Sequence, residues 1–310
     1  MDKLFGVLQV VLPVVVILLC GVLVRRKGIM SQTGMDQLKS LLVKICLPCL
    51  IFGTFYRMKF TGREAIAFFL MSGTTLGSFL LGFLVCRLLK ISQRTAPWMC
   101  TTIEGGSIGY ALFILLFSQD QLFHIGMLDA GNALIQWSLV MTMLAISGGE
   151  KKSAKETART LITPVNVAIV LGLVCSITGV GPRLAESRAG EILNSVLDFV
   201  GSPVSALIML SVGYGLSFRG IRWNEILKTA LARVIIFGAI GVVVCVLLNN
   251  TFPDDRMYLG AGLIFFICPP TFVYTMYTKT QEEDAYVSGF LAFYTLLTIA
   301  AFAVVAAVMI

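Results

Sequence analysis

The chain alternates between long apolar tracts and short polar connections over its whole length. A helix needs about 20 consecutive apolar residues to cross a bilayer, and ten tracts approach that length. They cover residues 4–24, 38–55, 65–86, 97–118, 122–147, 163–180, 190–217, 226–249, 257–278 and 285–309. The connections leave no room for a soluble domain. This pattern predicts an all-α membrane protein with ten transmembrane helices.

Two tracts are interrupted, and they occupy corresponding places in the two halves of the chain. The fourth contains EGGSIG at 104–109, and the ninth contains CPPTF at 268–272. The first and sixth tracts also align at Pro13 and Pro164, and the second and seventh each contain an interior proline. Because five helices are an odd number, the second half is expected to insert upside down as an inverted repeat. The predicted parts are a first five-helix repeat at 1–147, a cytoplasmic linker at 148–162 and an inverted second repeat at 163–310.

Charged side chains are scarce and gather between the apolar tracts. They make up 13% of the residues, against about 25% in soluble domains, and 57% are hydrophobic. The net charge of +7 comes from short clusters, which is typical of membrane-protein loops and not of a nucleic-acid surface. Loops after odd-numbered tracts hold about twice as many Lys and Arg as the others, which predicts that both termini face outside. We expect a multi-pass protein of the inner or plasma membrane, with the lipid bilayer and no nucleic acid as its partner.

The two interruptions predict a ligand site at mid-depth in the membrane. Proline removes a helical hydrogen bond, and glycine frees the backbone from helical geometry. Freed backbone groups are tolerated where protein or a water-filled cavity meets them, and the alternative is that both breaks are packing kinks. Where two half-helices meet, their N-termini suit a carboxylate and their carbonyl ends suit a cation. The residues expected to form this crossing are Glu104, Gly105, Gly106, Gly109, Pro269, Pro270 and Thr271.

Charged residues within the tracts are further candidates for substrate binding or ion coupling. Glu104 is the most interior acid, and we expect it to carry a coupling proton, to help bind a cation or to pair with Lys44. Lys44 is alternatively expected to extend toward the membrane interface, and the same snorkelling is the favoured interpretation of Arg233. Asp129 and Asn132 open the fifth tract, where they either line the outer mouth of the cavity or cap that helix.

The sequence offers few residues for catalytic, metal or redox chemistry. His124 is the single histidine, so neither a His-based triad nor a zinc site is expected, and no cofactor is implied. Cys46 and Cys49 form a C-x-x-C pair, in which a neighbouring thiol can resolve a mixed disulfide. A membrane thiol redox protein is therefore one alternative to a transporter. A non-transporting membrane receptor with the same fold is the other.

Several stretches of the chain resemble the auxin efflux carrier family, which includes plant PIN proteins and bacterial permeases. They are LPVVVILLCGVLVRRKGIM with LLVKICLPCLIF, LDAGNALIQW, TPVNVAIVLGLV with GSPVSALIMLSVGYGLSF, and PPTFVYTMYT followed by FYTLLT. The resemblance covers essentially the whole chain and implies a fold like those of the bile-acid symporter and NhaA, with helices 4 and 9 crossing beside the substrate. It also implies a scaffold of spans 1, 2, 6 and 7, a transport part of spans 3–5 and 8–10, and elevator-like movement of an organic anion.

The fourth tract departs from the family pattern, which is roughly N-T-G-x-x-G-x-P. Glu104 stands where that pattern has asparagine, and Ala111 stands where it has proline. An ionised Glu104 repels an organic anion, so it is protonated or paired, or the substrate is not a simple anion. The sequence predicts a secondary transporter, not an enzyme, that moves a small organic solute such as an auxin-like or dicarboxylate-like acid. H⁺ or Na⁺ is the candidate coupling ion, and a homodimer is the candidate assembly.

Overall fold

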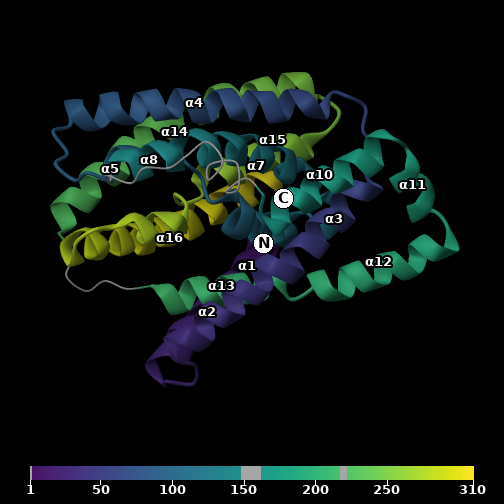
Figure 1. Cartoon of the computed structure of the whole chain (residues 1–310), viewed down its shortest axis with the longest axis horizontal. Coiled ribbons are helices and arrows are strands. Elements are labelled where there is room, and N and C mark those ends of the chain that lie inside the picture. Colours follow the sequence, from purple (N-terminus) through teal and green to yellow (C-terminus); the bar gives the residue numbers. More distant parts are fainter. Residues whose placement is uncertain (1, 148–161, 217–221) are drawn as a thin grey trace.

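The computed structural model describes residues 2–147, 162–216 and 222–310, and every regular element in these ranges is a helix (Figure 1). The first half contains α1 (Asp2–Arg26), α2 (Gln32–Leu41), η1 (Leu42–Cys46), α3 (Leu47–Arg57), α4 (Glu64–Leu88), α5 (Ala96–Met99), η2 (Gly105–Gly109), α6 (Tyr110–Leu116), η3 (Gln119–Gln121), α7 (Phe123–Ile135), η4 (Gln136–Val140) and α8 (Met141–Ser147). The second half contains α10 (Pro164–Ile177), α11 (Val180–Ala185), α12 (Arg188–Gly201), α13 (Val204–Gly215), α14 (Trp223–Thr251), α15 (Arg256–Ile267), η5 (Phe272–Tyr277) and α16 (Gln281–Met309). The all-α class is confirmed, while nearly all of the predicted linker at 148–162 lies outside the described residues.

Eight helical stretches in the described residues are long and apolar enough to cross a membrane. They are Phe5–Arg26, Gln32–Arg57, Glu64–Leu88, Phe123–Ser147, Arg188–Gly215, Trp223–Thr251, Arg256–Thr275 and Gln281–Met309. Two shorter apolar helices, Gly105–Leu116 and Pro164–Ile177, lie at the fourth and sixth predicted spans. The former is short because a break separates it from α5, and the latter ends just before Gly179, whose φ of 72° is left-handed. The count of ten and the inverted repeat stay predictions.

Polar side chains at the connections determine where helices begin. At the start of α2, Ser31 Oγ accepts a hydrogen bond from the N–H of Gly34 at 3.1 Å. At the start of α10, Thr163 Oγ1 accepts one from the N–H of Asn166, also at 3.1 Å. These N–H groups have no partner within the helix, so each cap stabilises its first turn.

The helices pack in two groups. In the first group, α1 lies along α13, and α3 packs on α10 and α12. In the second group, α4 lies along α7, and α14 packs on both α4 and α15 (Figure 1). We call α1–α3 with α10–α13 the first helix group, and α4–α8 with α14–α16 the second helix group. The division into scaffold and transport parts and the relative movement of the two groups stay predictions.

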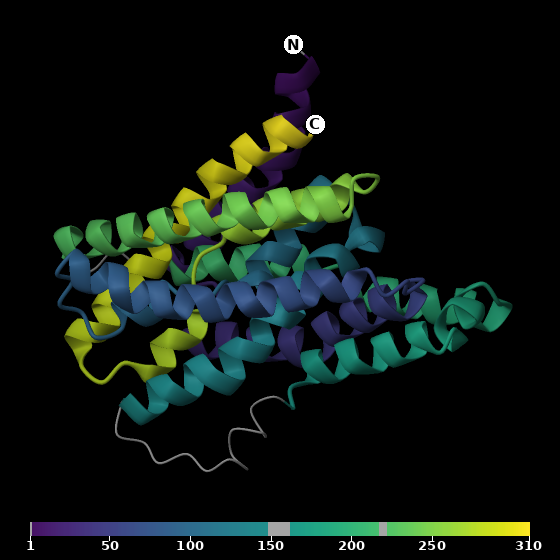
Figure 2. The same cartoon turned by 90° about the horizontal axis from the view of Figure 1, so that it is seen from above.

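The two helix groups are in contact through the first and last helices of the chain. α1 of the first helix group contacts α16 of the second, and the ends of the chain lie near each other in both views (Figures 1 and 2). α11 and α12 extend to one end of the molecule, away from the termini (Figure 2). Contacts between the groups are therefore spread over several helices, including α6 against α13.

Candidate functional site

Each of the two tracts predicted to be interrupted contains a non-helical segment, and the two segments meet. Residues 100–104 separate α5 from η2, and residues 268–271 separate α15 from η5. The N–H of Glu104 donates a hydrogen bond to the carbonyl of Pro269 at 2.8 Å, which joins the breaks through the main chain. The first break begins earlier than predicted, because Gly105, Gly106 and Gly109 belong to the π-helical turn η2.

The side chain of Glu104 holds the N–H side of this crossing. Its Oε2 accepts a hydrogen bond from the N–H of Phe272 at 3.1 Å, and its Oε1 accepts one from the hydroxyl of Ser107 at 2.6 Å. A carboxylate is suited to both bonds, since bonds to an ionised acceptor are about twice as strong as neutral ones. The chain thus places its own negative charge where a helix N-terminus favours an anion.

The side chain of Arg233 holds the carbonyl side of the crossing. It lies on α14, is fully buried, and donates from Nη1 to the carbonyls of Met99 at 2.5 Å and Thr102 at 2.8 Å. Its Nη2 donates to the carbonyl of Cys268 at 3.0 Å, so one guanidinium binds backbone from both broken segments. The rings of Phe237 and Tyr294 lie 4.3 and 5.0 Å from its Cζ.

The snorkelling interpretation of Arg233 is wrong. An arginine about two turns into a span can extend toward the interface, but here three backbone carbonyls freed by the breaks draw it inward. The signal was present in the sequence. The breaks predicted carbonyl ends that suit a cation, and Arg233 is the charged side chain that lies within the facing span.

Asp129 and Asn132 lie on one face of α7, and both are buried beside the crossing. Asn132 Nδ2 donates to the carbonyl of Ile103, in the first break, at 3.1 Å. Asp129 Oδ2 accepts a hydrogen bond from the hydroxyl of Tyr110 at 3.0 Å. The alternative that these residues cap the helix is wrong, because α7 begins at Phe123, well before them. The alternative that they line the outer mouth of the cavity stays a prediction.

Two glycines allow the Asp129 carboxylate to approach the backbone after the break. A Cβ on Gly105 would lie 2.5 Å from Asp129 Oδ1, and one on Gly106 would lie 3.0 Å from Oδ2. The ring of Phe265 also closes on the position of a Gly105 side chain. Glycine is therefore required at 105 by space, not by backbone angle.

We expect Gly105→Ala to destabilise the protein by about 1–3 kcal/mol, because a methyl group there forces Asp129 and Phe265 apart. The measurement is thermal unfolding of the purified protein in nanodiscs. Gly77→Ala is the matched control, since nothing lies within 4 Å of a Cβ at Gly77 in α4. Equal melting temperatures for the two variants would contradict the argument.

A pocket with a volume of about 480 Å³ lies against the crossing. Glu104, Gly105, Gly106, Asp129, Asn132 and Thr271 line it, together with Ser107. Its charged lining residues are Glu104, Asp129 and Lys39, and the rest of the wall is uncharged. Lys39, Thr163 and Gly215 line the end that lies near the ends of α2 and α13 and the start of α10. The pocket thus combines two acids, several hydroxyl and amide groups and an apolar wall.

The remaining predicted residues occupy different places. Pro269 and Pro270 are buried within the second break and do not line the pocket. Gly109 ends η2 and donates its N–H to the carbonyl of Glu104 at 3.3 Å. Lys44 has an exposed side chain in the π-helical turn η1 and does not line the pocket, so the structure does not bring it to Glu104.

The comparison with known families rests on nearly the whole chain. A model of the membrane transport protein family matches residues 6–306. The chain belongs to this family. An uncharacterized transporter from Methanothermobacter thermautotrophicus is 24% identical to this membrane transport protein over 225 residues, which cover 70% of each chain. The described part of the chain holds eight apolar helices of spanning length, so this membrane transport protein is an integral multi-pass membrane protein.

Proposed function

We propose that this protein is a secondary transporter that moves a small organic acid together with a proton. The observation that carries the proposal is the pocket at the crossing, whose wall holds the Glu104 and Asp129 carboxylates. Non-helical backbone at membrane depth is tolerated where it lines a cavity, and such breaks are typical of transporter binding sites. Membership of a transport family supports the same conclusion.

The charges of the pocket favour a proton as the coupling ion. Glu104 already accepts two hydrogen bonds from Phe272 and Ser107, so its oxygens are occupied by donors and not arranged around a metal ion. Asp129 lies against Gly105 and Gly106, the two residues that follow Glu104. Two carboxylates in one buried site repel each other, and a shared proton relieves that repulsion.

The rest of the pocket suits a small polar solute with a carboxylate. Lys39 supplies a positive charge at one end, and Ser211, Thr271 and Asn132 supply hydroxyl and amide groups. A proton on the Glu104–Asp129 pair reduces the repulsion that Glu104 would otherwise exert on the solute. This arrangement accounts for an acid at the position where the resembled family has asparagine.

The movement that we propose is an elevator-like shift of the second helix group against the first. Glu104, Asp129 and Arg233 all belong to the second helix group, so the crossing would move as a unit. Lys39 and Ser211 belong to the first helix group and would remain fixed. We place the protein in the inner or plasma membrane, with both termini outside.

The test is uptake of radiolabelled mono- and dicarboxylates into proteoliposomes under an imposed pH gradient. We expect at least one acid to accumulate when the source side is the more acidic, and to equilibrate without accumulation when the gradient is collapsed. Binding of an acid in a thermal-shift assay without counterflow in liposomes would support a receptor instead. Equal uptake with and without the gradient would contradict proton coupling.

The redox alternative predicts the opposite mutational pattern. Cys46 and Cys49 are free thiols that do not line the pocket. We therefore expect Cys46→Ser to retain wild-type uptake within about twofold, as surface or half-buried substitutions away from a site usually do. Loss of uptake in Cys46→Ser would favour thiol chemistry.

A further inference from the structure

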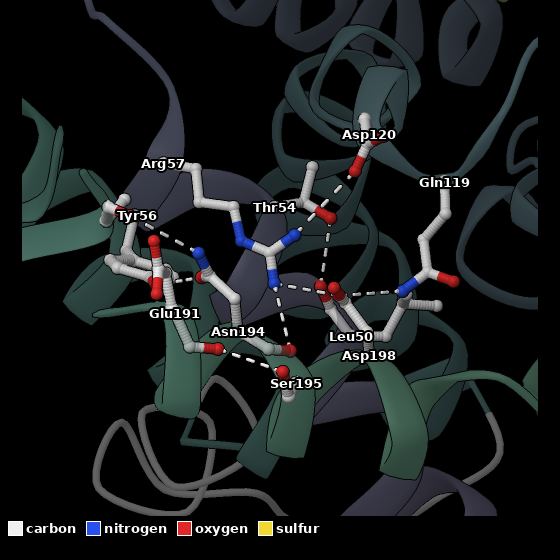
Figure 3. Close-up of polar contacts among 11 residues, drawn as sticks. Leu50, Thr54, Tyr56, Arg57, Gln119, Asp120, Glu191, Asn194, Ser195 and Asp198 are labelled. Carbon is white, nitrogen blue, oxygen red and sulfur yellow. Dashed lines mark hydrogen bonds and ion pairs between the residues drawn. The ribbon is translucent and has the colours of Figure 1, made fainter. Parts of the chain in front are cut away.

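A polar cluster lies at the end of α3 (Figure 3). Its residues Arg57, Gln119, Asp120 and Asp198 do not line the pocket. Arg57, the last residue of α3, donates from Nη2 to Asp198 Oδ1 of α12 at 2.7 Å. The same nitrogen lies 3.5 Å from the carbonyl of Asn194. α3 and α12 both belong to the first helix group, so this half of the cluster is a fixed pair. The sequence assigned Asp198 no role.

The other half of the cluster comes from the second helix group. Asp120 Oδ1 lies 3.7 Å from Arg57 Nη1, and Gln119 Nε2 donates to Asp198 Oδ1 at 3.3 Å. Figure 3 shows Arg57 between Asp198 and Asp120. Both Gln119 and Asp120 lie in η3, the short turn that connects α6 to α7. The cluster therefore ties the helices that carry the pocket acids to the opposite helix group.

This tie lies at the far end of the molecule from the lysine end of the pocket. Lys39, which lines the pocket, and Arg57 belong to one helical stretch, Gln32–Arg57. Eighteen residues separate them, which corresponds to about 27 Å along a helix axis. The two helix groups are thus joined by polar side chains at one end, while the pocket extends to the other.

We propose that Arg57, Asp198, Asp120 and Gln119 form a latch that keeps the pocket closed toward the α12 end and opens during transport. This inference rests on the proposed transport function. The Arg57–Asp198 contact within the first helix group is short at 2.7 Å, whereas the Asp120 side chain is 78% exposed and lies 3.7 Å from Arg57. Exposed ion pairs at this distance are weak, so the link between the groups breaks readily while the Arg57–Asp198 pair persists.

The experiment compares amide hydrogen exchange of the wild type and the Gln119→Ala/Asp120→Asn variant in nanodiscs. Release of the latch is expected to make backbone amides at 52–57 and 123–128 exchange about two- to fivefold faster, the range expected for a weak surface link. Amides at 163–167 and 211–216, beside the lysine end of the pocket, are expected to exchange more slowly, because that end closes when the other opens. This reciprocal change distinguishes a conformational shift from simple loosening.

Glu186→Gln is the matched control. Glu186 forms an ion pair with Lys59 at 3.2 Å, also near the α12 end. Glu186 follows α11 and Lys59 follows α3, so this pair does not involve η3. Unchanged exchange in Gln119→Ala/Asp120→Asn, or faster exchange at both ends of the pocket, would overturn the latch. The readout needs no substrate, so failure to find a transported acid would count against the proposed function and leave this result standing.

Discussion

Glu104→Gln abolishes proton-driven accumulation of the transported acid while leaving counterflow measurable. Glutamine keeps the size of the side chain and can still accept the bond from the N–H of Phe272, so the crossing is retained. The substitution removes the carboxylate that we propose shares a proton with Asp129. A gradient of one pH unit supports about tenfold accumulation per coupled proton, and this accumulation is expected to fall to equilibration in the variant.

Glu64→Gln is the matched control for this change. Glu64 is also a buried glutamate that accepts bonds from a main-chain N–H and a hydroxyl, both of Thr61, but it does not line the pocket. The Glu64→Gln variant should accumulate the acid to the same level as the wild type. Proton-driven accumulation by Glu104→Gln equal to that of Glu64→Gln would exclude Glu104 from coupling.

Arg233→Met is expected to cause the largest loss of stability. The substitution removes the donor to the carbonyls of Met99, Thr102 and Cys268, and a buried carbonyl left without a partner costs about 1–3 kcal/mol. The Glu104 charge would also lose the positive charge on the other side of the crossing. A total of about 3–5 kcal/mol corresponds to a fall of about 10 °C in Tm.

Thermal unfolding in nanodiscs measures this effect, with two comparison variants. Arg233→Lys retains the charge but not the forked guanidinium, so its Tm should lie between those of the wild type and Arg233→Met. Arg63→Met removes an exposed arginine at the start of α4 and should change Tm little. A Tm for Arg233→Met within about 2 °C of the Arg63→Met value would mean that the crossing does not depend on the guanidinium.

Much of the fold was predictable because lipid imposes a simple length rule. The apolar tracts located eight spanning helices, and the interruptions EGGSIG and CPPTF located both breaks. Their meeting was predicted from the idea that two matched breaks share one site, and the Glu104–Pro269 bond joins them. The length rule predicted a spanning helix at 163–180, but the apolar helix found there, Pro164–Ile177, is shorter than the spanning length.

The partners of the charged residues could not be predicted in the same way. Sequence position suggests how deep a side chain lies but not which way it points around the helix. Pairing with Glu104 was therefore considered for Lys44, which is exposed, and snorkelling was favoured for Arg233, which is fully buried. Asp198 had no assigned role because its partners, Arg57 and Gln119, lie in distant parts of the chain. Such contacts depend on tertiary packing that a single sequence does not encode in any local pattern.

The opposite charges of Glu104 and Arg233 determine how strongly the membrane potential acts on the proposed movement. Both belong to the second helix group, so in the proposed movement they would cross the electric field together. One unit charge is worth about 2.3 kcal/mol per 100 mV. With one shared proton, Glu104 and Asp129 together carry one negative charge, and the contribution of Arg233 cancels it. The crossing is then electrically silent, and voltage acts on the carrier only through the solute, the proton and the charges that are not paired in this way.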